Sequence, residues 1–91
     1  MVVRILADGQ YRIDDRHASQ IREIMRLDEM LMGAIDLHDE VGFDEALAHL
    51  VAYVHRIGQS VPDDELIPSD MIVPAADMTL IETQALLNGV S

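Results

Sequence analysis

The apolar residues between positions 42 and 58 recur at the spacing of an amphipathic α-helix. Intervals of four, three, four and three residues separate Phe43, Leu47, Leu50, Val54 and Ile57. An α-helix therefore places all of these side chains on one side. Because so wide an apolar stripe must be covered by other apolar surface, this segment predicts the element around which the rest of the chain packs.

A second helical pattern, Ile21–Leu37, precedes this segment and predicts its partner helix. A short polar linker, residues 38–40, joins the two patterns, and so short a connection favours an antiparallel helical hairpin. We expect the Asp14–Asp15 pair to cap the first helix, which then begins near Arg16. Asp39 is expected to cap the second helix.

Two glycines bear on the geometry of this hairpin. Gly33 lies inside the first helical pattern, where glycine costs about 1 kcal/mol relative to alanine, and we interpret it as a point of close approach by the second helix. Gly58 follows the second pattern and is expected to end that helix in the left-handed conformation.

Two β-type segments, Val2–Leu6 and Tyr11–Ile13, flank an Asp8–Gly9 pair, and Asp-Gly is typical of tight hairpin turns. With these two residues as the loop, Leu6 lies opposite Tyr11. Side-chain alternation then assigns each residue to one face of the hairpin. The residues directed towards the helices are Val2, Leu6, Tyr11 and Ile13, and those on the outer face include Val3, Ile5 and Arg12.

The C-terminal third begins with residues 59–78, which contain all three prolines and predict an extended connection. Within it, the apolar triplet Met71–Val73 predicts a short edge strand that pairs with the N-terminal hairpin. Thr79 and Glu82 have the spacing of a capping box, which predicts a short helix over Leu80–Leu87.

Together these elements predict an α+β fold in a single domain, residues 1–91. An N-terminal β-hairpin (1–14), with a short third strand near 71–73, packs on an antiparallel helical hairpin (15–58). An extended connection (59–78) leads to a short C-terminal helix (79–89).

The charge of the chain is strongly negative and unevenly distributed. Six arginines and no lysine face seventeen acidic residues, a net charge of −11. Residues 1–26 carry five arginines against four acids, whereas residues 27–91 carry one arginine against thirteen. This balance opposes direct binding to nucleic acid or to an anionic membrane. The acidic surface is either a solvated exterior or a docking surface for a basic partner.

The sequence predicts neither an enzyme nor a metal site. His49 and His55 are six positions apart and cannot chelate one ion on a helix, and the acids around His38 resemble any acidic turn. Carboxylate pairs such as Asp63–Asp64 lie in a loop with nothing nearby to perturb them. We therefore predict no catalytic residue and no cofactor. The absence of cysteine and of a long apolar run favours a cytoplasmic protein.

Several segments together resemble the PspA-associated domain family, PspAA. The opening MVVRILADGQYRIDD is similar to the family's "M-I-V-R-I-x-G-E-G-Q-Y-x-V-D-D" start. Residues 58–77 resemble its "L-G-x-x-L-P-D-D-E-L-x-P-S-D-L-x-L-P-x-x-D" connection, and residues 79–87 its closing helix. The chain departs from the pattern at Ala7–Asp8, where the family has Gly-Glu, and at His38, where it has glycine.

The resemblance implies a non-enzymatic module that binds and modulates a PspA-like coiled-coil protein of the envelope stress response. Such a partner would recruit the chain to the inner face of the membrane. From the residues, we predict a binding surface on the first helix and the outer face of the β-hairpin. Its members are Arg22, Arg26, Met30 and Met32 on the helix, and Val3, Ile5 and Arg12 on the hairpin.

Two other interpretations stay open. One is a self-associating structural module, such as a homodimer, without a link to PspA. The other is a small regulator that responds to a metal ion or a ligand. The chain has six methionines, three of them within Met25–Met32. These either fill the core or form an adaptable apolar seam for another helix.

Overall fold

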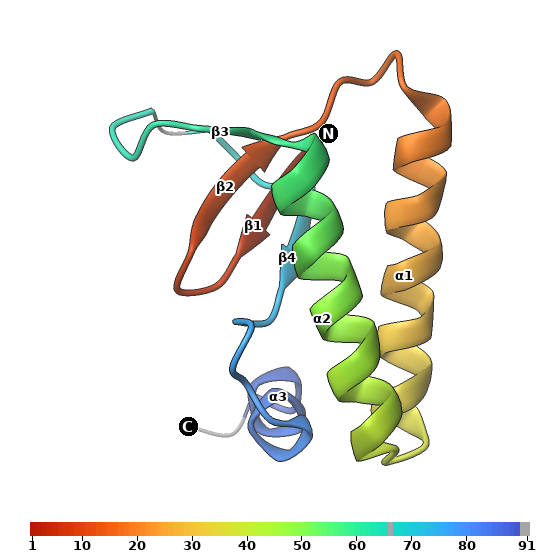
Figure 1. Cartoon of the computed structure of the whole chain (residues 1–91). Coiled ribbons are helices and arrows are strands. Elements are labelled where there is room, and N and C mark those ends of the chain that lie inside the picture. Colours follow the sequence, from red (N-terminus) through yellow and green to blue (C-terminus); the bar gives the residue numbers. More distant parts are fainter. Residues whose placement is uncertain (66, 90–91) are drawn as a thin grey trace.

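An antiparallel helical hairpin forms one layer of the structure, and a four-stranded sheet lies against it (Figure 1). The structure is a computed structural model that describes residues 1–65 and 67–89. The long helices are α1 (Ala18–Asp36) and α2 (Glu40–Ile57). A short helix, α3 (Leu80–Leu87), lies below the sheet, beside the turn between the long helices. The predicted α+β fold is confirmed.

The core lies between the two layers, where the apolar stripes of the helices meet one face of the sheet. The predicted stripe of α2 is confirmed, because Phe43, Leu47, Leu50 and Val54 are all completely buried or nearly so. The buried side chains that face them are Ile24, Leu27, Leu31, Ala34 and Ile35 of α1, Val3, Ile5 and Ile13 of the N-terminal segment, and Val73 and Leu80 further along the chain.

The helix ends agree with the sequence prediction at three of four positions. Asp39 caps α2 by accepting a hydrogen bond from the Gly42 N–H at 3.0 Å, and α1 ends at Leu37. Thr79 and Glu82 form the predicted capping box of α3. The start of α1 was predicted wrongly, because its cap position is His17. Asp14 accepts hydrogen bonds from the backbone and guanidinium of Arg16 instead.

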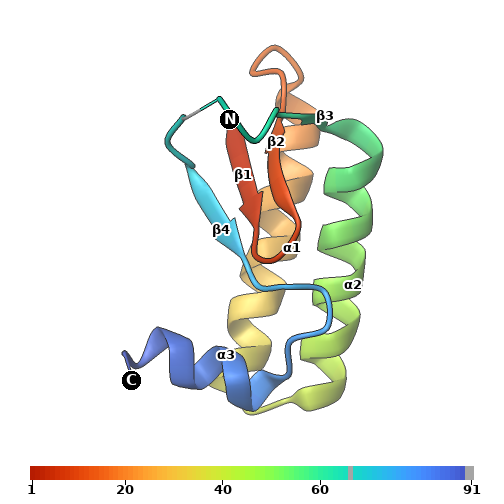
Figure 2. The same cartoon turned by 90° about the vertical axis from the view of Figure 1, so that its left-hand side faces the viewer.

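The sheet has the strand order β3-β2-β1-β4. The hairpin strands β1 (Val2–Ile5) and β2 (Gly9–Arg12) are antiparallel, and β4 (Met71–Val73) runs parallel to β1 (Figure 2). The predicted strand at 71–73 is therefore confirmed at one edge. The other edge is a two-residue strand, β3 (Gln59–Ser60), which the sequence did not indicate.

The register of the β-hairpin differs from the prediction, and this reverses the faces of β1. Val3, not Leu6, lies opposite Tyr11, because the loop has three residues, Leu6–Asp8, and Ala7 adopts a left-handed φ of 63°. A shift by an odd number of residues moves every side chain of a strand to the other face. Val3 and Ile5 consequently point into the core.

The prediction for Gly33 was wrong, whereas Gly58 does end α2 but not in the predicted conformation. A side chain at Gly33 would meet no atom within 4 Å, so no close approach of α2 requires that glycine. Gly58 is extended, with φ −83° and ψ 153°, and not left-handed. The space around Gly58 is nevertheless crowded, because an added Cβ atom would lie 3.0 Å from the Tyr11 Cβ atom and 3.1 Å from the Ile13 Cδ1 atom.

A single buried glutamine fixes the extended connection to the outer face of the sheet. The Gln10 amide donates hydrogen bonds to the Ile67 carbonyl at 2.9 Å and to the Ser69 hydroxyl at 2.8 Å. The Gln10 carbonyl accepts a further bond from the Val61 N–H at 2.9 Å. These contacts place β3 and β4 on either side of the hairpin.

Candidate functional site

The predicted partner residues of α1 are all exposed, but they lie on different sides of that helix. Met30 and Met32 are two positions apart, which at 3.6 residues per turn places them about 160° apart. Met30 lines a hollow shared with α2, whereas Met32 faces the side of β4 and α3. One flat partner surface therefore does not include both methionines.

The flank of α1 next to α2 carries Arg26 in an ion pair with Glu23, one turn before it. This contact lowers the pKa of Glu23 and raises that of Arg26. Arg26 and Glu23 line a hollow of about 310 Å³ between α1 and α2. Tyr53 of α2 also lines it, and the Tyr53 ring centroid lies 5.3 Å from the Arg56 guanidinium carbon. Since exposed ion pairs contribute little, we expect little stabilisation from the Arg26 pair.

The predicted partner residues of the β-hairpin divide between the core and the surface. Val3 and Ile5 are buried, so their placement on an outer binding face is wrong, and the register shift is the cause. Arg12 does lie on the exposed side, where its guanidinium forms a 3.3 Å ion pair with Glu65 of the extended connection. A partner would reach only Arg12 of these three residues.

An apolar groove lies between α1, the β4 edge and α3. It has a volume of about 370 Å³. Figure 2 shows α3 below the end of β4, and the Gln84 amide of α3 donates a hydrogen bond to the Ile35 carbonyl of α1. The rim is exposed: Met32 by 42%, Ile72 by 63% and Leu87 by 56%. The other lining residues are Leu6, Asp28, Leu31, Ile35, Pro74, Thr83 and Leu86.

Asp28 is the charged residue of this groove. Desolvation by the surrounding apolar side chains raises its pKa above the ordinary value of 3.8, and the neighbouring charge of Glu29 adds to the rise. Among the described residues, no hydrogen-bond donor and no cation lies within bonding distance of this carboxylate. Asp28 was not among the residues predicted for the site, although it lies three residues after Met25 and four before Met32, on one flank of a helix.

A polar cluster joins the hairpin loop to the last turn of α2. Asp8 lies 2.6 Å from the His55 Nε2 atom and accepts a hydrogen bond from the Tyr11 hydroxyl at 2.7 Å. The hydrogen bond from Tyr11 lowers the pKa of Asp8 most, and the contact with His55 lowers it further. The same bond to Asp8 raises the pKa of Tyr11. The His55 and Tyr11 rings are 5.2 Å apart. The cluster holds the loop against α2, and the sequence alone gave no signal for it.

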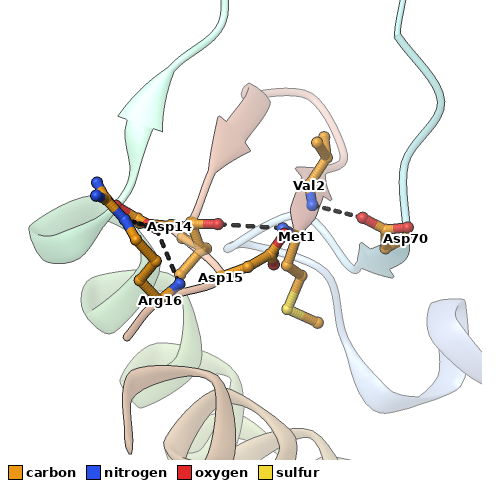
Figure 3. A network of polar contacts seen from close by, with 7 residues as sticks. Met1, Val2, Asp14, Asp15, Arg16 and Asp70 are labelled. Carbon is orange, nitrogen blue, oxygen red and sulfur yellow. Dashed lines mark hydrogen bonds and ion pairs between the residues drawn. The ribbon is translucent and has the colours of Figure 1, made fainter. Parts of the chain in front are cut away.

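A second polar network ties the beginning of the chain to its neighbours (Figure 3). The Met1 ammonium group donates to the Ile13 carbonyl at 3.1 Å and to the Asp15 carboxylate at 2.6 Å. The Val2 N–H donates to the Asp70 carboxylate at 2.7 Å, and the Asp70 N–H returns a bond to the Val2 carbonyl. The two Val2–Asp70 bonds lie directly before the β1–β4 pairing and help to hold β4, which forms one wall of the groove, against β1.

The histidines contact different neighbours in the fold and do not gather at one site. His38, in the turn between α1 and α2, lies 2.7 Å from the Gln84 amide of α3, and His17 lies 4.0 Å from Asp14. Within residues 1–65 and 67–89, no three histidine or acidic side chains are grouped so that they could hold a metal ion. Over the same residues, none of the helices combines the length and the apolar character that a bilayer crossing requires.

The fold and this groove define a small α+β domain that offers apolar surface, with one unpaired carboxylate, to the outside. Comparison with protein families then identifies it. The family model described as PspA-Associated protein matches residues 1–91, and the chain belongs to that family. The predicted resemblance is thereby confirmed over nearly the whole sequence. Neither the curated proteins nor the solved structures give a match to the chain.

Proposed function

We propose that this chain is a non-enzymatic interaction module that binds a PspA-like coiled-coil protein and modulates it. The observation that carries the proposal is the family match over residues 1–91, because the family is described by its association with PspA. The exposed apolar groove supports the proposal independently of the family match. Soluble domains rarely expose contiguous apolar surface without an interaction that uses it.

The surface chemistry supports a protein partner over a lipid or nucleic acid. The net charge of −11 repels phosphate-rich surfaces, so contact with the membrane would pass through the partner. We propose a cytoplasmic protein that a PspA-like partner recruits to the inner face of the membrane. Met32, which is 42% exposed on α1 at the rim of the groove, is flexible enough to fit the apolar seam of another helix.

Direct binding tests this proposal. The purified chain is titrated into a PspA-like protein by isothermal calorimetry, and the mixture is followed by sedimentation velocity at several concentrations. We expect a saturable complex that sediments faster than either component. The acidic charge calls for a control, for which a chain of similar size and charge from another family serves. Failure to form a complex at concentrations well above micromolar would overturn the proposal.

A further inference from the structure

The groove between α1, β4 and α3 lacks a cover in the structure. Its floor contains buried Leu31, Ile35 and Thr83, whereas Met32, Ile72 and Leu87 stand exposed on its rim. A pocket of apolar walls with an exposed apolar rim is the usual form of a site that takes the side chains of a partner helix. The three elements that build it come from distant parts of the sequence and are brought together only by the fold.

Asp28 supplies the chemistry that identifies the occupant. Its carboxylate is half-buried on the groove wall, and among the described residues it has neither an ion-pair partner nor a hydrogen-bond donor. A desolvated carboxylate without a partner is unfavourable, and the approach of a cation offsets that cost. An occupant of complementary chemistry is therefore apolar and carries one basic side chain.

We propose that this groove docks an amphipathic helix of the partner, which inserts apolar side chains between α1 and α3 and pairs a lysine or arginine with Asp28. The inference rests on the proposed function, since it takes the helix from the PspA-like coiled coil. The proposed surface differs from the one predicted from the sequence, because of the residues expected on α1 only Met32 lines the groove. Arg26 and Met30 lie on the other flank.

Two other occupants are disfavoured by the structure. A second copy of this chain brings another net charge of −11, which opposes association of the two acidic surfaces. An added β-strand would need the open edge of β4, but that strand has only three residues and is followed directly by Pro74. Short edge strands bounded by proline are poor templates for strand addition.

Site-directed crosslinking tests the location of the helix. The chain has no cysteine, so single-cysteine variants carry a benzophenone label at one chosen position. Ile72→Cys and Leu87→Cys place the label on the rim. The controls are Ile81→Cys, on the opposite side of α3 and 69% exposed, and Val41→Cys, at the start of α2 and 68% exposed. Met30→Cys probes the flank next to α2.

We expect the rim labels to crosslink to the PspA-like protein, and the labels at positions 41, 81 and 30 to give at most background. Crosslinks from Met30→Cys without any from the rim would overturn the groove and leave the proposed function standing. Crosslinks between two copies of this chain through the rim would also overturn it, in favour of a homodimer. A wild-type chain that does not bind the partner refutes the proposed function itself.

The charge of Asp28 is tested separately by affinity. Asp28→Asn keeps the shape of the side chain and removes its charge, and we expect binding to weaken about tenfold. The control, Asp44→Asn, removes an exposed charge on α2 that is not part of the groove and should change affinity less than about twofold. Asp28→Asn must fold at least as stably as the wild type, since it removes an unpaired charge. Unchanged affinity in Asp28→Asn would refute the ion pair.

Discussion

Two glycine-to-alanine substitutions should change the stability of this domain in opposite directions. At Gly58, an added Cβ atom would lie 2.7 Å from the Val54 carbonyl oxygen, 3.0 Å from the Tyr11 Cβ atom and 3.1 Å from the Ile13 Cδ1 atom. At Gly33, it would meet no atom within 4 Å. Both glycines have backbone angles that alanine tolerates, so the space around each decides the sign.

The magnitudes follow from these contacts. Overpacking a well-filled site costs about 1–3 kcal/mol, and two of the three atoms facing Gly58 are backbone or Cβ atoms that cannot move alone. Alanine recovers about 0.4–1 kcal/mol by restricting the unfolded chain. Gly58→Ala should therefore destabilise by roughly 1–2 kcal/mol. Gly33→Ala, in the last turns of α1, should stabilise by about 0.5–1 kcal/mol.

Urea and thermal unfolding followed by circular dichroism measure both effects. For a domain of this size, each kcal/mol corresponds to about 4–8 °C in Tm. The double variant should show additive changes, because residues 33 and 58 lie near opposite ends of the helical hairpin. If Gly58→Ala were as stable as the wild type, the close packing of α2 on β2 that we describe would be wrong.

Three further predictions concern single side chains. Gln10→Ala removes both amide bonds to the extended connection and should destabilise by about 1–3 kcal/mol, with faster proteolysis within residues 59–70, measured by mass spectrometry. Thr79→Ala breaks the capping box of α3 and should cost about 1 kcal/mol, with loss of hydrogen-exchange protection confined to residues 80–87. Asp28→Asn should have little effect on stability below about pH 3.8 and a stabilising effect that grows as the pH rises through the raised pKa of Asp28 and then levels off. The folded chain holds the Asp28 proton more tightly than the unfolded chain, so ionisation above that pH lowers the wild-type stability alone.

The order and type of the principal elements could be predicted because local patterns determine them. The intervals between Phe43 and Ile57 specify a helix, and the Thr79–Glu82 spacing specifies a cap, without reference to the rest of the chain. The same reasoning failed for the hairpin register. Asp8–Gly9 is compatible with loops of two or three residues, and Ala7 took the left-handed conformation that the prediction reserved for this pair.

The candidate site could be predicted only in part, because it depends on how distant segments pack. Met32 was predicted as a partner-binding residue of α1, and it is 42% exposed at the rim of the groove. Its neighbours in the groove, Ile72 and Leu87, come from β4 and α3, whose positions beside α1 no local pattern specifies. The Asp8–His55 contact joins residues 47 positions apart and was hidden for the same reason.

The helix α3 is only weakly attached to the rest of the domain, and a partner bound in the groove would stabilise it. Within the described part of this helix only Leu80 and Thr83 are buried, while Ile81, Leu86 and Leu87 remain exposed. The Gln84 amide also contacts the long helices, by a hydrogen bond to the Ile35 carbonyl of α1 and a 2.7 Å contact with His38 in the α1–α2 turn. A ligand that binds only the folded state stabilises that state. Binding of a partner should therefore stabilise α3, which buries little apolar surface, more than it stabilises the α1–α2 pair. The wall that the isolated chain supports least is therefore the one that a docked helix would complete.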